Sequence, residues 1–252
     1  MSFKFNLIKI IYGLYTWLIF LLCVLAALIF ATIMPTLDYR RFWVGKCARL
    51  VFTLCGIKMN INGLNFIPNG RALIVANHAS YLDGVILHAV LPVQYTFVIK
   101  SEMQSVPIAN YLFKRVGSRF VERFKPKGSF RDARKLIKAA SRGESLAIFP
   151  EGTFTEKPGL NKFRAGAFTS AIKSNIPLIP LVIRGSRKIL PANKFLPVHG
   201  KIKIDILTAI KPNNKAYESS RNLSTLAREK ILEKLNEPDL LLTKKNNIKI
   251  KS

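Results

Sequence analysis

ALIVANHASYLD, residues 72–83, is the stretch that decides the fold, because it joins a buried strand to two residues capable of catalysis. Its apolar run at 73–76 is typical of a buried strand. His78 and Asp83 follow, five residues apart, which at about 100° per residue would leave them roughly 140° apart on one continuous helix. They can therefore meet only across a turn, with His78 in the loop that leaves the strand and Asp83 in the first turn of the next helix.

A histidine oriented by a carboxylate is suited to general-base catalysis. Asp83 can keep one imidazole nitrogen protonated and leave the other free to accept a proton near neutral pH. If the attacking group is a hydroxyl of the substrate, no serine or cysteine nucleophile is required. A purely structural interpretation is equally open, because Ser80 and Asp83 have the spacing of a capping box, and Asn77 and His78 are common turn residues.

The chain beyond residue 58 alternates short apolar runs with amphipathic segments, which predicts an α/β fold with a mixed central sheet flanked by helices. Helical periodicity is clearest at 129–141, where Gly143 is expected to end the helix, and a last helix is expected at 223–235. The expected strands are 58–62, 73–76, 95–99, 119–121, 146–149, 178–183 and 201–207.

The amino-terminal segment predicts a membrane anchor. From Ile10 to Leu37 about 28 residues carry no charge, more than the roughly 20 needed to cross a bilayer core. A second apolar patch at 50–57 is too short to span and predicts an amphipathic helix in the interface. Either the first helix crosses the membrane once, or the two helices form a monotopic hairpin in one leaflet. The chain is thus divided into an anchor (1–57), an α/β domain (58–240) and a basic polar tail (241–252).

The charge balance predicts an anionic partner. Forty Lys and Arg residues against fourteen Asp and Glu give a formal net charge of +26. Together with the apolar segment, this favours anionic membrane lipids over nucleic acid, for which the sequence has no fold signature. Basic residues are denser after the apolar run than before it, which favours a domain on the cytoplasmic face. The three cysteines have neither metal-ligand nor disulfide spacing, and no metal site is expected.

Three further segments are expected to bring polar groups to the carboxyl edge of the sheet, where ligands of open α/β folds bind. FPEGT, residues 149–153, ends a strand and leaves Glu151 at that edge. VGSRFVER, residues 116–123, ends in Arg123, whose planar fork can bind a phosphate. FRAGAF, residues 163–168, opens a helix that can present Arg164 to an anion. Each segment also has a plain interpretation, as a surface turn, a solvated charge or an ordinary helix start.

These motifs in this order, with IPL at 179–181, resemble the glycerolipid acyltransferases of the lysophosphatidic acid acyltransferase type over about residues 60–210. The resemblance implies that His78, held by Asp83, deprotonates the free hydroxyl of a lysolipid, namely 1-acyl-sn-glycerol-3-phosphate. The hydroxyl then attacks the thioester of acyl-CoA or acyl carrier protein, with no metal, cofactor or covalent acyl-enzyme. It also implies that Lys100, Arg123 and Glu151 bind the acceptor. With Gly152, Thr153 and Arg164 they make up the expected substrate-binding set.

One position departs from the family pattern. Many lysophosphatidic acid acyltransferases have arginine directly after Glu-Gly-Thr, whereas this chain has Phe154. Either Lys157, Lys162 or Arg164 replaces the missing phosphate contact, or the acceptor is a lysolipid whose headgroup is not a bare phosphomonoester. Two alternatives stay open at this stage: a thioester hydrolase in which His78 activates water, and a non-catalytic basic protein of the membrane surface. His88 and His199 have no acidic residue at a useful spacing and are expected to be structural.

Overall fold

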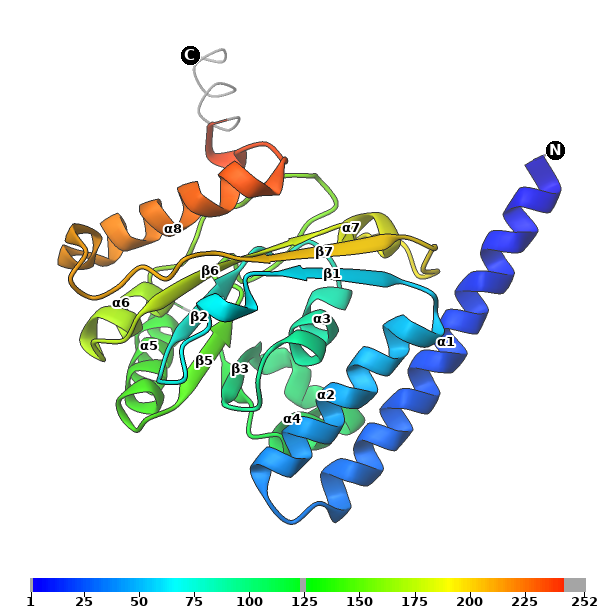
Figure 1. Ribbon diagram of the computed structural model, residues 1–252, viewed down its shortest axis with the longest axis horizontal. Helices are drawn as coiled ribbons and strands as arrows, with labels where there is room; N and C mark the ends of the chain where they lie inside the picture. Colours follow the sequence, from blue (N-terminus) through cyan, green and yellow to red (C-terminus); the bar gives the residue numbers. More distant parts are fainter. Residues whose placement is uncertain (1, 123–125, 243–252) are drawn as a thin grey trace.

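A seven-stranded sheet forms the centre of the computed structural model, which describes residues 2–122 and 126–242 (Figure 1). Strands β6 and β7 are antiparallel, and all other neighbouring strands are parallel. The mixed central sheet is as predicted. In spatial order the strands are β1 (Lys58–Asn62), β7 (Lys201–Ile206), β6 (Leu178–Arg184), β2 (Leu73–Ala76), β5 (Ser145–Ile148), β3 (Tyr95–Lys100) and β4 (Arg119–Val121).

Every expected strand is present, with ends that agree to within one residue. The central strands β2 and β5 are buried along their whole length, because helices cover both faces of the sheet. Side chains of successive strand residues point to opposite faces. Accordingly, Ile74 packs into the core on one face, whereas Leu73 and Val75 pack into the core on the other.

The helices divide between these two faces. On one face lie α2 (Leu37–Leu54) and α3 (Leu82–Val90), and on the other lie α5 (Pro126–Ser141), α6 (Gly166–Lys173) and α8 (Ser220–Leu235). Gly143 follows α5 with φ of 101°, a left-handed conformation that ends the helix as predicted. The remaining helical segments are α4 (Pro107–Arg115), α7 (Ser186–Ile189) and the short 3₁₀ turns Leu64–Phe66, Ser101–Ser105 and Lys215–Glu218.

The first helix, α1 (Ser2–Ile33), pairs with α2 in a hairpin at one end of the molecule (Figure 1). Within the described part of the chain, α1 is the one helix whose length and apolar composition suffice to cross a membrane, over Leu7–Ile33. Its outward face is apolar and exposed, for example at Leu14, Leu18 and Leu21. This helix indicates that the chain associates with membranes.

The second helix differs from the prediction of an interfacial helix at 50–57. It begins at Leu37, where the Thr36 hydroxyl accepts the Tyr39 N–H at 3.4 Å, so residues 50–54 are only its last turns. The sequence prediction treated the basic residues at 40–49 as a flank of the anchor, and so missed the helix start. One side of α2 is buried, and Val51 and Phe52 belong to the same core as α3 and the sheet.

Candidate active site

The loop between β2 and α3 places His78 beside Asp83. Because β2 ends at Ala76 and α3 begins at Leu82, the two residues lie on opposite sides of a turn, as predicted, with 2.9 Å between His78 Nδ1 and Asp83 Oδ2. Asn77 fixes the start of this loop to β6. Its side-chain amide donates to the Ile183 carbonyl at 2.9 Å and accepts the Ile183 N–H at 2.7 Å. The loop is therefore anchored at both ends.

Asp83 is fully buried and its Oδ2 atom accepts three hydrogen bonds. Besides His78 Nδ1, the donors are the N–H groups of Ala79 at 2.6 Å and Ser80 at 2.8 Å. The contact with Ser80 is one half of a capping box. One carboxylate thus holds the backbone of the turn that precedes α3 and also contacts the imidazole. Because the carboxylate can only accept, Nδ1 carries the proton and Nε2 is left as a base.

Aromatic rings enclose the His78 imidazole, whose side chain is 15% exposed. Phe149 stacks on it with ring centroids 4.2 Å apart, and Phe154 approaches edge-on at 4.5 Å. Tyr81 packs at right angles to Phe154 at 4.8 Å. Among the described residues, none makes a hydrogen bond to His78 Nε2. The basic nitrogen therefore faces an apolar, aromatic rim, and the residue that departs from the family pattern is part of that rim.

Glu151 lies directly behind the catalytic loop and is 5% exposed. Its Oε1 accepts the His78 backbone N–H at 2.7 Å, and its Oε2 accepts the Asn161 N–H at 2.9 Å. Burial raises the pKa of this carboxyl from 4.5 to about 7. The carboxylate thus joins the His78 loop to the loop at 152–165. An additional contact with an acceptor, which the family resemblance implied, stays a prediction.

Gly152, Thr153 and Arg164 lie beside Glu151. Gly152 has φ of 80°, and a Cβ atom there would lie 2.6 Å from Arg164 Nε. The Arg164 backbone N–H donates to the Pro150 carbonyl at 2.9 Å, which brings this segment against the FPEGT turn. The structure therefore gathers these three predicted residues, with Thr153 and Arg164 exposed.

Lys100 is exposed at the carboxyl end of β3, on the same edge of the sheet as the end of β2. It pairs in register with Val121, the last residue of β4. Among the described residues, no hydrogen bond or ring contact joins Lys100 to His78, so the substrate-binding role of Lys100 stays a prediction. Arg123 lies outside the described residues.

A contact that sequence analysis missed holds the loop at 155–161. Arg228 of α8 is 8% exposed and donates to both oxygens of Asp239, each at 2.6 Å, and to the Leu160 carbonyl at 2.7 Å. It also donates to the carbonyl of Asn161, whose N–H reaches Glu151. The one local signal was an arginine next to Ala227 on the otherwise apolar face of α8.

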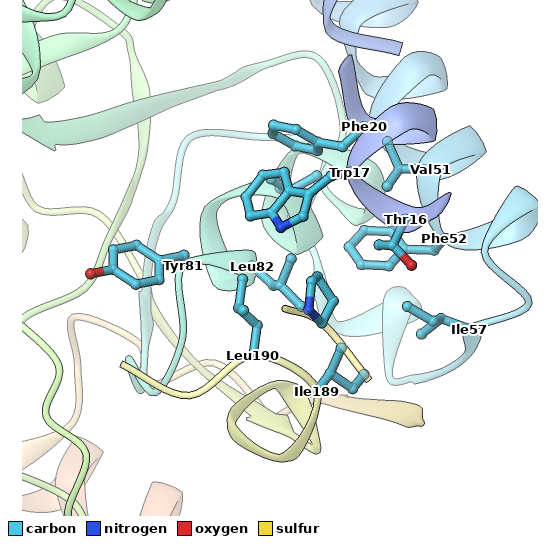
Figure 2. Close-up of a pocket in the computed structure, with 12 residues that line it drawn as sticks. Thr16, Trp17, Phe20, Val51, Phe52, Ile57, Tyr81, Leu82, Ile189 and Leu190 are labelled. Carbon is cyan, nitrogen blue, oxygen red and sulfur yellow. The ribbon is translucent and has the colours of Figure 1, made fainter. Parts of the chain in front are cut away.

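An apolar cavity of about 60 Å³ adjoins the catalytic loop (Figure 2). Tyr81 and Leu82, which follow the loop, form one wall, and Leu190 lies beside them. Trp17 and Phe20 of α1 lie across from Leu82 (Figure 2). The loop that carries His78 therefore borders, through Tyr81, an apolar hollow between the sheet domain and α1.

The other two histidines make structural contacts, as expected. His88 stacks on Phe97 with centroids 3.8 Å apart, and burial lowers the pKa of His88 to about 4, so it is neutral at physiological pH. His199 lies 3.1 Å from the Gly56 carbonyl through Nε2. Across the residues that the structure describes, no cluster of three or more His, Cys, Asp or Glu side chains could hold a metal ion.

Comparison with known proteins gives three findings. The acyltransferase family model matches residues 58–184, half of the chain. A chloroplastic 1-acyl-sn-glycerol-3-phosphate acyltransferase of Brassica napus is 30% identical over 183 residues, 71% of this chain and 51% of that protein. A lyso-ornithine lipid O-acyltransferase of Pseudomonas aeruginosa is 32% identical over 152 residues, 60% of this chain and 55% of that protein. The chain thus spans about half the length of these curated relatives.

The fold has also been seen in a crystal structure. The 1-acyl-sn-glycerophosphate acyltransferase PlsC of Thermotoga maritima superposes with a TM-score of 0.75 over 90% of this chain and 94% of that one, at 21% identity. At this identity the likeness concerns the fold. The family match, together with the motif order, confirms the resemblance stated from the sequence: the chain belongs to the acyltransferase family.

Proposed function

We propose that this protein transfers an acyl group from an acyl thioester to the free hydroxyl of a lysolipid, with 1-acyl-sn-glycerol-3-phosphate as the acceptor. The observation that carries the proposal is the pair formed by His78 and the buried Asp83, which leaves Nε2 as a base at an aromatic rim. Acyl-CoA or acyl carrier protein is the proposed donor.

The proposed reaction needs one base and no covalent intermediate on the protein. His78 Nε2 takes the proton of the lysolipid hydroxyl while its oxygen attacks the thioester carbonyl. Asp83 stabilises the imidazolium that forms. Collapse of the tetrahedral intermediate breaks the carbon–sulfur bond, and the thiolate leaves with the proton from His78. The products are the acylated lipid and a free thiol.

The phosphate of the acceptor is proposed to bind at the carboxyl edge of the sheet, near Lys100, Arg123 and Arg164. Thr153 is exposed next to Gly152, and Gly152 permits the close approach of Arg164. In this proposal Glu151 acts mainly by joining the two loops that form the site, because both its oxygens already accept backbone N–H groups.

A second candidate acceptor is a lysolipid whose headgroup is not a bare phosphomonoester. Phe154 favours it, because this ring packs on His78 at the position where many family members have arginine. The lyso-ornithine lipid O-acyltransferase among the relatives shows that such an acceptor occurs in the family.

We further propose that α1 and α2 enter a single leaflet, with the catalytic domain at the cytoplasmic face and anionic lipids as partners. The helix α1 is bound to the rest of the molecule at two levels, at Tyr12 and at Ala31. The Tyr12 hydroxyl donates to the Cys55 carbonyl at 2.9 Å, and Arg115 Nε donates to the Ala31 carbonyl at 2.8 Å. A helix fixed at both of these levels cannot cross to the other leaflet without carrying part of the domain with it.

The catalytic proposal is tested with His78→Ala. We expect a loss of about 10²- to 10⁴-fold in turnover, with unchanged circular dichroism and vesicle binding. Thiol release is measured with and without lysolipid, because a hydrolase would release thiol equally in both. Near-full activity of the variant, or release that ignores the lysolipid, would contradict the proposal.

The acceptor is tested with Phe154→Arg, using Phe154→Leu as the control that removes the ring without adding a charge. If the lost arginine limits phosphate binding, only Phe154→Arg should shift preference toward lysophosphatidic acid, by up to about 1.5 to 3 kcal/mol for a charge-assisted hydrogen bond. Mass spectrometry of products from mixed lysolipids gives the preference. Equal shifts in both variants would mean that loss of the Phe154 ring, and not the added charge, changes the acceptor preference.

A further inference from the structure

We propose that the loop between α7 and β7 makes a second membrane contact, with the Phe195 ring inserted into the leaflet that receives α1. Phe195 is 86% exposed, the highest value among the large apolar side chains that the structure describes. Insertion of this ring into lipid would remove its apolar surface from water, which is favourable. The neighbouring Leu196 is also partly exposed.

The loop is fixed to α1 at two points. The Trp17 indole N–H donates to the Phe195 carbonyl at 2.6 Å. Leu196 packs so closely on Gly13 that a Cβ atom at that glycine would lie 3.0 Å from the Leu196 side chain. Because Gly13 and Trp17 are four residues apart, both contacts lie on one face of α1. The loop therefore lies at the level of residues 13–17 of α1.

The face of α1 that contacts the loop borders a stripe of exposed leucines on the same helix. Leu14, Leu18 and Leu21 repeat at helical spacing, about 100° from Gly13 and Trp17, and are 59%, 55% and 53% exposed. Phe195 thus continues a surface that already indicates membrane association, which favours lipid over a protein partner as its occupant. The loop at 190–200 contains no acidic residue and carries the exposed Lys194. Its charge therefore suits anionic headgroups.

The same loop contributes to the apolar cavity beside the catalytic loop. Leu190 and Pro197 line it, opposite Trp17 of α1, and the Leu190 carbonyl accepts the Ser80 hydroxyl at 2.6 Å. Insertion of Phe195 would therefore bring this cavity to the surface of the leaflet, where apolar chains are available. The position of the cavity at the leaflet does not depend on which acceptor or donor the protein uses.

The test measures the depth of residue 195 directly. The three native cysteines are each at most 6% exposed, so an environment-sensitive nitrobenzoxadiazole label can be attached selectively to Phe195→Cys in the full chain. The labelled protein is reconstituted into phosphatidylcholine–phosphatidylglycerol vesicles that carry nitroxide groups on the acyl chains. Matched labels are placed at Lys234→Cys, exposed on α8, and at Leu18→Cys, exposed on α1.

We expect the nitroxide lipids to quench the label at residues 195 and 18 at least two-fold, and to leave the label at residue 234 unchanged. Aqueous iodide should quench only the label at 234. If residue 195 instead follows residue 234 in both measurements, the loop lies in water and the inference is overturned. Neither measurement requires turnover, so the result is independent of the proposed acyl transfer.

Discussion

A single oxygen atom, Asp83 Oδ2, connects the turn before α3 to the His78 imidazole. Two backbone N–H groups and His78 Nδ1 share it. The same atom therefore fixes the loop and selects the tautomer that leaves Nε2 basic. This explains why the sequence motif had two equally good interpretations, since helix capping and base orientation need the same residue at the same spacing.

Asp83→Asn separates these two roles. An amide oxygen can still accept the backbone N–H groups, but a neutral side chain cannot stabilise the imidazolium. We expect turnover to fall by at least about 10²-fold, while the melting temperature changes little. Kinetics with a lysolipid and an acyl thioester, together with thermal unfolding, test this. A variant with high activity would show that Asp83 serves mainly as a helix cap.

Glu151→Gln tests the raised pKa of the buried carboxyl. An acid whose pKa is about 7 in the folded state and 4.5 when unfolded holds its proton more tightly when folded. Its stabilising contribution is therefore present below pH 4.5 and is lost as the pH rises toward 7. We expect the unfolding free energy of the wild type, relative to Glu151→Gln, to fall by up to about 3 kcal/mol across this range. Denaturant titrations at several pH values measure it, and parallel pH profiles would contradict it.

At the scale of elements, a contact between α8 and the segment that follows it supports the loops next to Glu151. Arg228 and Asp239 hold the loop at 155–161, and that loop places the Asn161 N–H on Glu151. We expect Arg228→Lys to destabilise the fold by about 2 kcal/mol, because lysine cannot reproduce a buried bidentate pair. It should also raise KM for the acceptor while KM for the thioester stays constant.

The control for this change is Arg221→Lys, an exposed arginine in the first turn of the same helix. It should alter neither the unfolding free energy nor either KM. If Arg228→Lys raises KM equally for both substrates, the contact between Arg228 and Asp239 acts on overall stability alone. Steady-state kinetics with each substrate varied in turn make the distinction.

The strands could be predicted from sequence because each is a short apolar run bounded by turn residues, as at 73–76 and 178–184. The pairing of His78 with Asp83 was also predictable, since the two residues are only five positions apart. The start of α2 was missed because its basic residues suggested a membrane flank. The contact between Arg228 and Leu160 joins residues 68 positions apart, and no local pattern reports such a contact.

At the scale of the whole molecule, α2 connects the amino-terminal hairpin to the core. Phe52 is 1% exposed and packs in the cluster that includes Ile86 of α3 and Ile204 of β7. Removal of residues 1–57 would therefore take part of the core away with the anchor. The boundary at residue 57, which was predicted from the sequence, marks a change in composition. The packing of the core continues across it.

Phe52→Ala should accordingly destabilise the folded state by about 3 to 5 kcal/mol, the usual cost of truncating a buried phenylalanine. Leu18→Ala, at a position of α1 that is 55% exposed, should leave the unfolding free energy within about 0.5 kcal/mol. Unfolding in a fixed detergent, followed by near-ultraviolet circular dichroism, compares them. Equal effects would mean that α2 is only peripherally attached.

The pairing of β1 with β7 also sets an order of events during synthesis. Asn62 of β1 bonds to Asp205 of β7, 143 residues later, so at 5 to 20 residues per second a ribosome needs roughly 7 to 30 s to supply the partner strand. The apolar α1 emerges long before that. We expect a membrane or a chaperone to receive this helix while β1 is still an unpaired edge, before the sheet is complete.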